Sequence, residues 1–125
     1  MEEGRNKLDR ATELQERAKT FAIGIICAFT APPKSDEARV IGRQFLRSGT
    51  AVAANYRAAC RARSKAEFIS KMGVVVEEAD ETEFWLKLLV ETKLVPAVSI
   101  APLRNECAEL LKIFSSSLAT AKTNR

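Results

Sequence analysis

The stretch from Arg63 to Leu89 most constrains what this chain can fold into. Ser64 and Glu67 have the S-x-x-E spacing of a capping box, which marks the start of a helix. From Phe68 onward, apolar residues recur at alternating steps of four and three, which keeps one stripe of a helix against a neighbour. Near Leu89 the apolar residues continue around the helix beyond that stripe. A helix with this distribution must meet more than one partner surface.

Prolines mark the other boundaries. Pro32 and Pro33 break the chain ahead of Asp36, which suits a helix N-terminus, and Pro96 follows the stretch described above. The helical period of the apolar residues between these breaks predicts four helices. Their expected ranges are 7–30, 37–61, 65–93 and 100–121. Because short loops between long helices favour antiparallel neighbours, we predict an all-α fold, an antiparallel up-down-up-down four-helix bundle, in a single domain over residues 1–125.

Composition limits the setting in which the protein works. The chain is 46% apolar and 29% charged, which is typical of a folded globular protein. No segment approaches the ~20 apolar residues needed to cross a bilayer, so we expect no membrane partner. The chain start has no apolar signal core. Cys27, Cys60 and Cys107 are far apart in the sequence and form no C-x-x-C pair. We expect three buried, reduced thiols and a cytoplasmic protein.

The chain contains no histidine. This excludes Ser-His-Asp and Cys-His catalysis, most zinc sites and the Glu-x-x-His pairs of di-iron bundles. The carboxylates of Glu77 and Glu81, four residues apart, would suit only an oxygen-ligated cation such as Mg²⁺ or Ca²⁺, and solvated acids or partners for arginine are the simpler interpretation. We therefore predict a protein that is not an enzyme, with no catalytic residues, no metal site and no cofactor.

The second predicted helix carries an unusual row of arginines. At 100° per residue, five of them lie opposite its apolar face, and two further cations follow in the next turn. These seven are Arg39, Arg43, Arg47, Arg57, Arg61, Arg63 and Lys65. No acidic residue occurs between Arg39 and Arg63, and the net charge is +4. Planar guanidinium groups bind phosphate in a fork. The row therefore predicts contact with the backbone of RNA or DNA, without a base-reading motif.

Other interpretations of the same helix stay open. The third helix carries an acidic cluster of Glu77, Glu78, Asp80, Glu81 and Glu83, whose carboxylates could pair with the arginines within or between chains. In that case the protein would be a protein-interaction scaffold. Ser48 and Asn55 lie within and at the margin of the apolar face of the second helix. We expect their side chains to be satisfied by hydrogen bonds between helices, with a ligand contact as the alternative.

Four residues of the third helix lie outside its core stripe and predict a homo-oligomer interface: Val74, Phe84, Trp85 and Leu88. Large aromatic side chains dominate interface energetics, and Trp85 is the only tryptophan. The alternatives are that the bundle is bent, or that the loop 31–36 covers these residues.

The same residues resemble a known family. The matching motifs are Phe45-Leu46-Arg47-Ser48-Gly49, Val52-Ala53-Ala54-Asn55-Tyr56-Arg57, Arg63-Ser64 with Glu67-Phe68-Ile69-Ser70-Lys71, Glu77-Glu78-Ala79-Asp80-Glu81-Thr82 and Trp85-Leu86. Together they look like the bacterial four-helix-bundle family known as the 23S ribosomal-RNA intervening-sequence proteins. More distantly, the chain resembles the accessory protein of diversity-generating retroelements, which binds a reverse transcriptase and nucleic acid.

This resemblance implies a ring-like homopentamer without enzymatic activity. It also implies two function classes: an RNA- or DNA-binding protein, or an accessory subunit of a reverse transcriptase or ribosome-associated factor. In one respect the chain departs from the family. Where members commonly carry a glutamate after the Asn-x-x triplet, this chain has Ala58, which leaves the second helix more positive.

Overall fold

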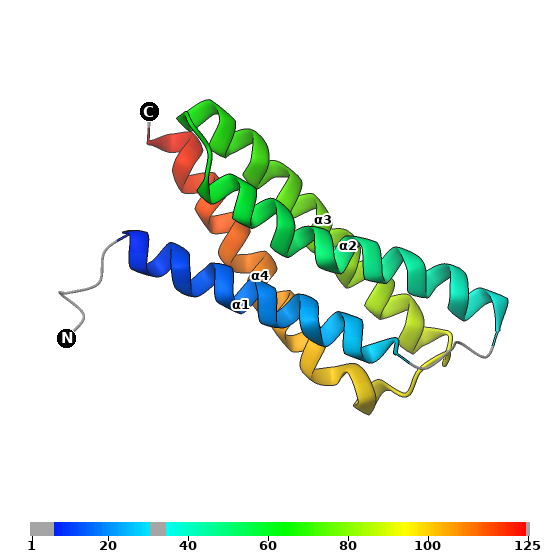
Figure 1. Ribbon diagram of the computed structural model, residues 1–125. Helices are drawn as coiled ribbons and strands as arrows, with labels where there is room; N and C mark the ends of the chain where they lie inside the picture. Colours follow the sequence, from blue (N-terminus) through cyan, green and yellow to red (C-terminus); the bar gives the residue numbers. More distant parts are fainter. Residues whose placement is uncertain (1–6, 31–34, 125) are drawn as a thin grey trace.

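The structure is a computed structural model that describes residues 7–30 and 35–124. It contains the helices α1 (Lys7–Ala28), α2 (Asp36–Cys60), α3 (Lys65–Glu91) and α4 (Ala97–Thr123), with no strand among the described residues. Each helix packs on the next in the chain, and α4 closes the bundle against α1 through a narrower contact (Figure 1). The predicted all-α up-down-up-down bundle is confirmed.

Side-chain caps fix the start of the two central helices. The Ser35 hydroxyl accepts a hydrogen bond from the backbone N–H of Ala38, and the Ser64 hydroxyl accepts one from that of Glu67, both at 3.1 Å. An N-cap of this kind satisfies one of the four unpaired N–H groups of a helix start and contributes about 1 kcal/mol. The predicted start at Ser64 is therefore confirmed.

Six of the eight predicted helix ends differ from the structure, by one to three residues. Helix α1 ends at Ala28 rather than at residue 30, and α4 begins at Ala97, three residues earlier than predicted. Pro102 therefore lies inside α4, where its nitrogen cannot donate to the carbonyl of Val98. Val98 is highly exposed, so water can reach that turn.

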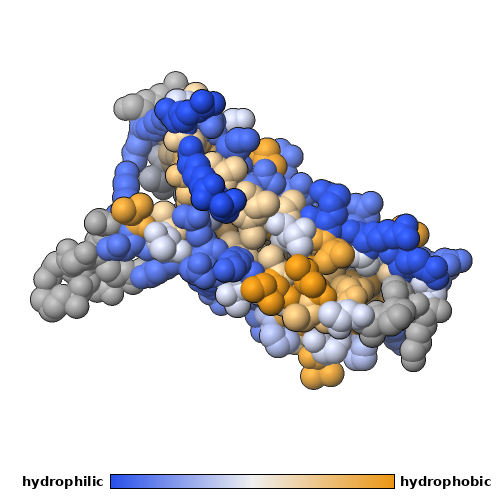
Figure 2. Space-filling model, viewed as in Figure 1, coloured by the Kyte–Doolittle hydropathy of each residue, from blue (hydrophilic) through white to orange (hydrophobic). Residues whose placement is uncertain are grey.

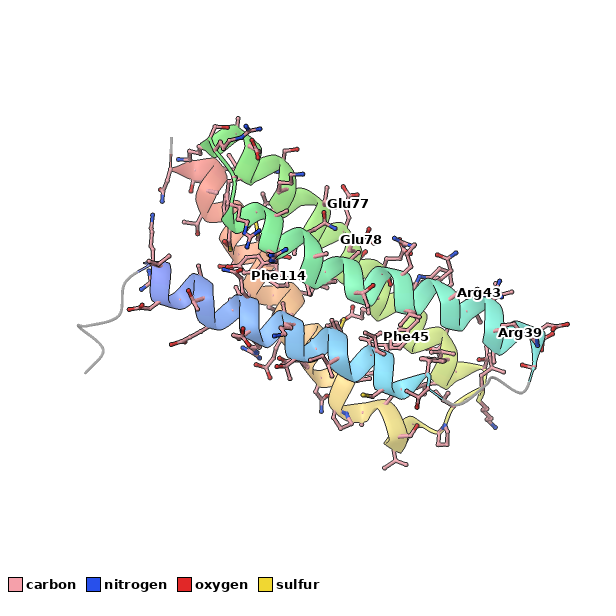
Figure 3. The ribbon with its side chains drawn as sticks, viewed as in Figure 1. Arg39, Arg43, Phe45, Glu77, Glu78 and Phe114 are labelled. Atoms are coloured by element: carbon pink, nitrogen blue, oxygen red, sulfur yellow. The ribbon has the colours of Figure 1, made fainter. Side chains whose placement is uncertain are left out.

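The core lies between all four helices. Its largest fully buried side chains include Phe45 of α2, Phe114 of α4 and Leu86 of α3. The predicted stripe of α3 is buried along its length at Met72, Val75, Ala79, Thr82, Leu86 and Leu89. The ring of Phe114 packs 5.1 Å from that of Tyr56, measured between centroids. Figure 3 shows Phe45 and Phe114 between the helices, away from the outer surface.

Glycine lets α1 approach α2 closely. A Cβ atom at Gly49 would lie 2.9 to 3.0 Å from side-chain carbons of Ile25, and one at Gly42 would lie 3.1 Å from the ring of Phe29. Ile25 is fully buried. The side chains of Ile25 in α1 and of Phe29 just after it thus fill the space that a side chain larger than glycine would need at these positions of α2.

Polar bonds cross three of the helix–helix contacts, and the one between α4 and α3 runs from the Cys107 thiol to the carbonyl of Ala79 at 3.5 Å. Between α2 and α3, the buried hydroxyls of Ser48 and Thr82 form a hydrogen bond at 2.9 Å, as expected for Ser48. Asn55 instead donates to the carbonyl of Ala51 in its own helix, so the expected bond between helices is absent there. Between α1 and α4, Arg17 pairs with Glu106 and Glu109.

Arg17 of α1 forms an ionic contact with α4. Its Nε lies 2.7 Å from Oε2 of Glu106, and its Nη2 lies 2.7 Å from Oε1 of Glu109. These charge-assisted bonds raise the pKa of Arg17, first through Glu106 and then through Glu109. They lie at the contact where the backbone packing of the bundle is narrowest.

Candidate nucleic-acid interface

The core positions the cations of α2. Because Phe45, Val52 and Tyr56 turn inward, the residues on the opposite side of the helix face solvent. Arg39, Arg43, Arg47, Arg57 and Arg61 are all exposed, as are Arg63 and Lys65 in the next turn and at the start of α3. Figure 3 shows Arg39 and Arg43 on the outer side of α2. The predicted exposure of this row is therefore confirmed.

Arg47 is occupied by acids of α3. Its Nη1 lies 3.2 Å from Oε2 of Glu78, and its Nη2 bonds to the carboxylate of Glu81. Both contacts raise the pKa of Arg47, the larger effect coming from Glu78. A guanidinium held by two carboxylates has few donors left for phosphate. The predicted alternative, pairing within the chain, therefore holds at this position.

Trp85 belongs to the same network. Its indole Nε1 donates to Oε2 of Glu81 at 2.9 Å. This bond and the contact with Arg47 lower the pKa of Glu81, and the indole has the larger effect. The carboxylate therefore stays ionised well into the acidic range, and its bond to Arg47 weakens only as the pH falls through that lowered pKa. We call Arg47, Glu78, Glu81 and Trp85 the Arg47 lock.

Two other cations have weaker pairs. Arg39 lies 3.1 Å from Asp36 in the first turn of α2, and both side chains are exposed. Nε of Arg63 lies 3.9 Å from Glu67, at the outer limit of an ion pair, and the Arg63 side chain is 91% exposed. Exposed pairs of this kind contribute about 0–1 kcal/mol, so a phosphate can replace the carboxylate.

The remaining four cations stand without an acid partner. Within residues 7–30 and 35–124, no carboxylate forms an ion pair with Arg43, Arg57, Arg61 or Lys65. Three of these lie in or beside the last turn of α2, and Arg43 lies near its beginning. The Arg47 lock thus interrupts a row that looks continuous in the sequence.

The residues predicted to form an oligomer interface divide into two groups. Val74 and Phe84 are 37% and 52% exposed, whereas Trp85 and Leu88 are half-buried. The rings of Phe84 and Trp85 meet edge to face with centroids 5.1 Å apart. Of the loop 31–36, suggested as a cover, residues 31–34 lie outside the described part of the chain.

The cysteines are free thiols in three environments. Cys107 is buried, Cys60 is half-buried and Cys27 is exposed, so the expectation of three buried thiols holds only for Cys107. Burial, followed by the nearby Glu83 and Asp80, raises the pKa of Cys107 to about 12. Within the described ranges no cluster of three or more histidine, cysteine or acidic side chains could hold a metal ion. None of the described helices is both long and apolar enough to span a bilayer.

The chain matches a family model and is similar to solved structures. The model, described as 23S rRNA-intervening sequence protein, covers residues 10–116. One of these structures is that of a protein of unknown function from the S23 ribosomal protein family of Bacteroides thetaiotaomicron, which is 32% identical with a TM-score of 0.77. That match covers 87% of this chain and 97% of the other. No curated protein matches. The chain therefore belongs to the 23S rRNA-intervening sequence protein family.

Proposed function

We propose that this protein binds RNA or DNA through the backbone phosphates, using the cations of α2 and the following turn that the Arg47 lock leaves free. The observation that carries the proposal is that Arg43, Arg57, Arg61 and Lys65 are exposed and have no acid partner among the described residues. Unpaired cations on one face create a positive potential that attracts a polyanion. The family description names 23S rRNA, which makes RNA the first ligand to test.

Reversing two of these charges tests the proposal. Because each phosphate contact releases bound counterions, Arg43→Glu with Arg57→Glu should weaken RNA binding at least about tenfold and flatten its dependence on salt. The measurement is fluorescence anisotropy with a labelled RNA at several salt concentrations. The control is Arg104→Glu with Lys112→Glu, which makes the same charge change on α4 at two exposed positions. Equal losses for both pairs would show a general charge effect and contradict the proposal.

A second candidate is a protein-interaction scaffold, for example an accessory subunit of a reverse transcriptase or a ribosome-associated factor. The Arg47 lock supports it, because it shows that carboxylates of a helix engage an arginine of α2. Affinity capture after nuclease treatment separates the two functions. A partner that is retained without nucleic acid favours the scaffold, and a partner that is released favours nucleic-acid binding.

We also propose that the chain forms a homo-oligomer through the outer edge of α3, as a ring-like pentamer by analogy with the resemblance noted above. Phe84 supports this, because an aromatic ring half open to water gains free energy when a second copy covers it. Phe84→Ser should shift the mass measured by light scattering toward the monomer. The matched control is Leu8→Ser, because Leu8 is also a highly exposed apolar residue but lies on α1 instead of α3. An unchanged mass for Phe84→Ser would exclude this edge as the interface.

A further inference from the structure

We infer that the phosphate site is confined to the turn between α2 and α3, and that it holds a run of about four phosphates of a nucleic-acid backbone. The site consists of Arg57, Arg61, Arg63 and Lys65, which we call the turn cluster. This inference rests on the proposed function and narrows it, because the sequence alone suggests one continuous site of seven cations along α2.

The Arg47 lock divides the row of cations. Arg47 lies between Arg43 and Arg57 on the outer side of α2, and its guanidinium is held by Glu78 and Glu81. Glu77, which precedes Glu78 on α3, is exposed. Figure 3 shows Glu77 and Glu78 beside the middle of α2. A phosphate strand lying along the whole helix would have to pass these carboxylates, at a cost in repulsion.

Among the described residues, the turn cluster has one acid partner, Glu67, which pairs with Arg63. Between Arg57 and Lys65 the only other residues are alanines, Cys60 and Ser64, and none of them is acidic or bulky. Arg57 and Arg61 are one helical turn apart, about 6 Å along the axis. Glu67 reaches only Arg63, at 3.9 Å.

The beginning of α2 is of another kind. Asp36 and Glu37 precede Arg39, Asp36 pairs with Arg39, and Val40 between the two arginines is 61% exposed. Mixed charge with exposed apolar surface is more typical of contact with protein than with phosphate. In Figure 2 strongly hydrophilic residues gather toward both ends of α2, with paler residues between them. The two ends are thus separate surfaces of unlike chemistry.

The number of phosphates follows from the number of available cations. The logarithm of the binding constant falls with the logarithm of salt concentration by about 0.9 per phosphate in duplex DNA and about 0.7 in single strands. Four contacts predict slopes of about −3.6 and −2.8, and seven contacts would give about −6.3 and −4.9. The slope therefore reports how much of the row is used.

The test compares two matched pairs of substitutions on one helix. Arg57 and Arg61 repeat the orientations of Arg39 and Arg43, because eighteen residues make about five full turns. Arg57→Gln with Arg61→Gln is compared with Arg39→Gln with Arg43→Gln, using the full chain. The probes are a labelled single-stranded RNA, the DNA strand of the same sequence and its duplex. Circular dichroism melting checks that both variants fold.

The turn-cluster pair should lose about tenfold or more in affinity and about 1.4 in slope on single strands, and the pair at Arg39 and Arg43 should lose clearly less of each. Equal losses for the two pairs, or a wild-type slope near that of seven contacts, would overturn the confinement to the turn and leave nucleic-acid binding intact. If the wild-type protein binds none of the three probes, the proposed function itself fails. Which probe binds best identifies the strand type.

Discussion

Phe114→Ala is expected to lower the free energy of unfolding by about 3–5 kcal/mol. Phe114 is fully buried, and its ring packs 5.1 Å from that of Tyr56. Its removal loses the transfer free energy of the ring and leaves a cavity that helices on several sides cannot fill by small movements. Denaturant unfolding followed by circular dichroism measures the change.

The matched control is Phe84→Ala. The same atoms are removed, but from a ring that is 52% exposed on the outer edge of α3. At concentrations where the chain is monomeric, the loss should be about 1 kcal/mol or less, because little buried surface disappears. Comparable losses at the two positions would contradict the placement of the core between the four helices.

Two helical glycines are expected to respond to alanine with opposite signs. Gly49→Ala should destabilise the protein by about 1–3 kcal/mol, because the new methyl group would lie 2.9 to 3.0 Å from side-chain carbons of the fully buried Ile25. Gly73→Ala should stabilise it by up to about 1 kcal/mol, because alanine is the better helix former and the new methyl group would meet no atom of the described residues within 4 Å beyond its own helix backbone and chain neighbours.

Thermal and denaturant unfolding measure the change in stability of each variant. Because both substitutions replace a helical glycine by alanine, the gain in helix propensity is the same and the difference between them reports the packing. A stabilised Gly49→Ala would show that α1 can withdraw from α2 without loss, against the close approach described above. A destabilised Gly73→Ala at low protein concentration would show that another part of the chain covers α3 there.

The sequence was a good guide to the helices and a partial guide to the candidate site. Capping signals are local, so the start at Ser64 could be predicted. Helix α4 begins three residues before its predicted start, because Pro102 is tolerated inside a helix where its turn is open to water. Helical periodicity also predicted the buried stripe of α3 and the exposed side of α2.

The pairing of the cations could not be predicted in the same way. A helical wheel places Arg43 and Arg47 on one face, but only the rotation and axial position of α3 decide which of them meets Glu78 and Glu81. The role of Trp85 depends on the same geometry. Its indole was predicted for a contact between subunits, and it donates to Glu81 within the chain. Whether it also contacts a second copy is still a prediction.

The bond between Arg17 and Glu106 has a consequence for how the chain assembles. It joins residues 89 positions apart, whereas the other three helix–helix contacts connect neighbours in the chain. Pairs of adjacent helices close short loops and form early. The contact between α1 and α4 closes a loop of nearly the whole chain, so its loop-closure entropy is lost before the contact stabilises the fold. We therefore expect fast folding, as is typical of low contact order. The ion pair between Arg17 and Glu106 should form late in folding and mainly slow unfolding.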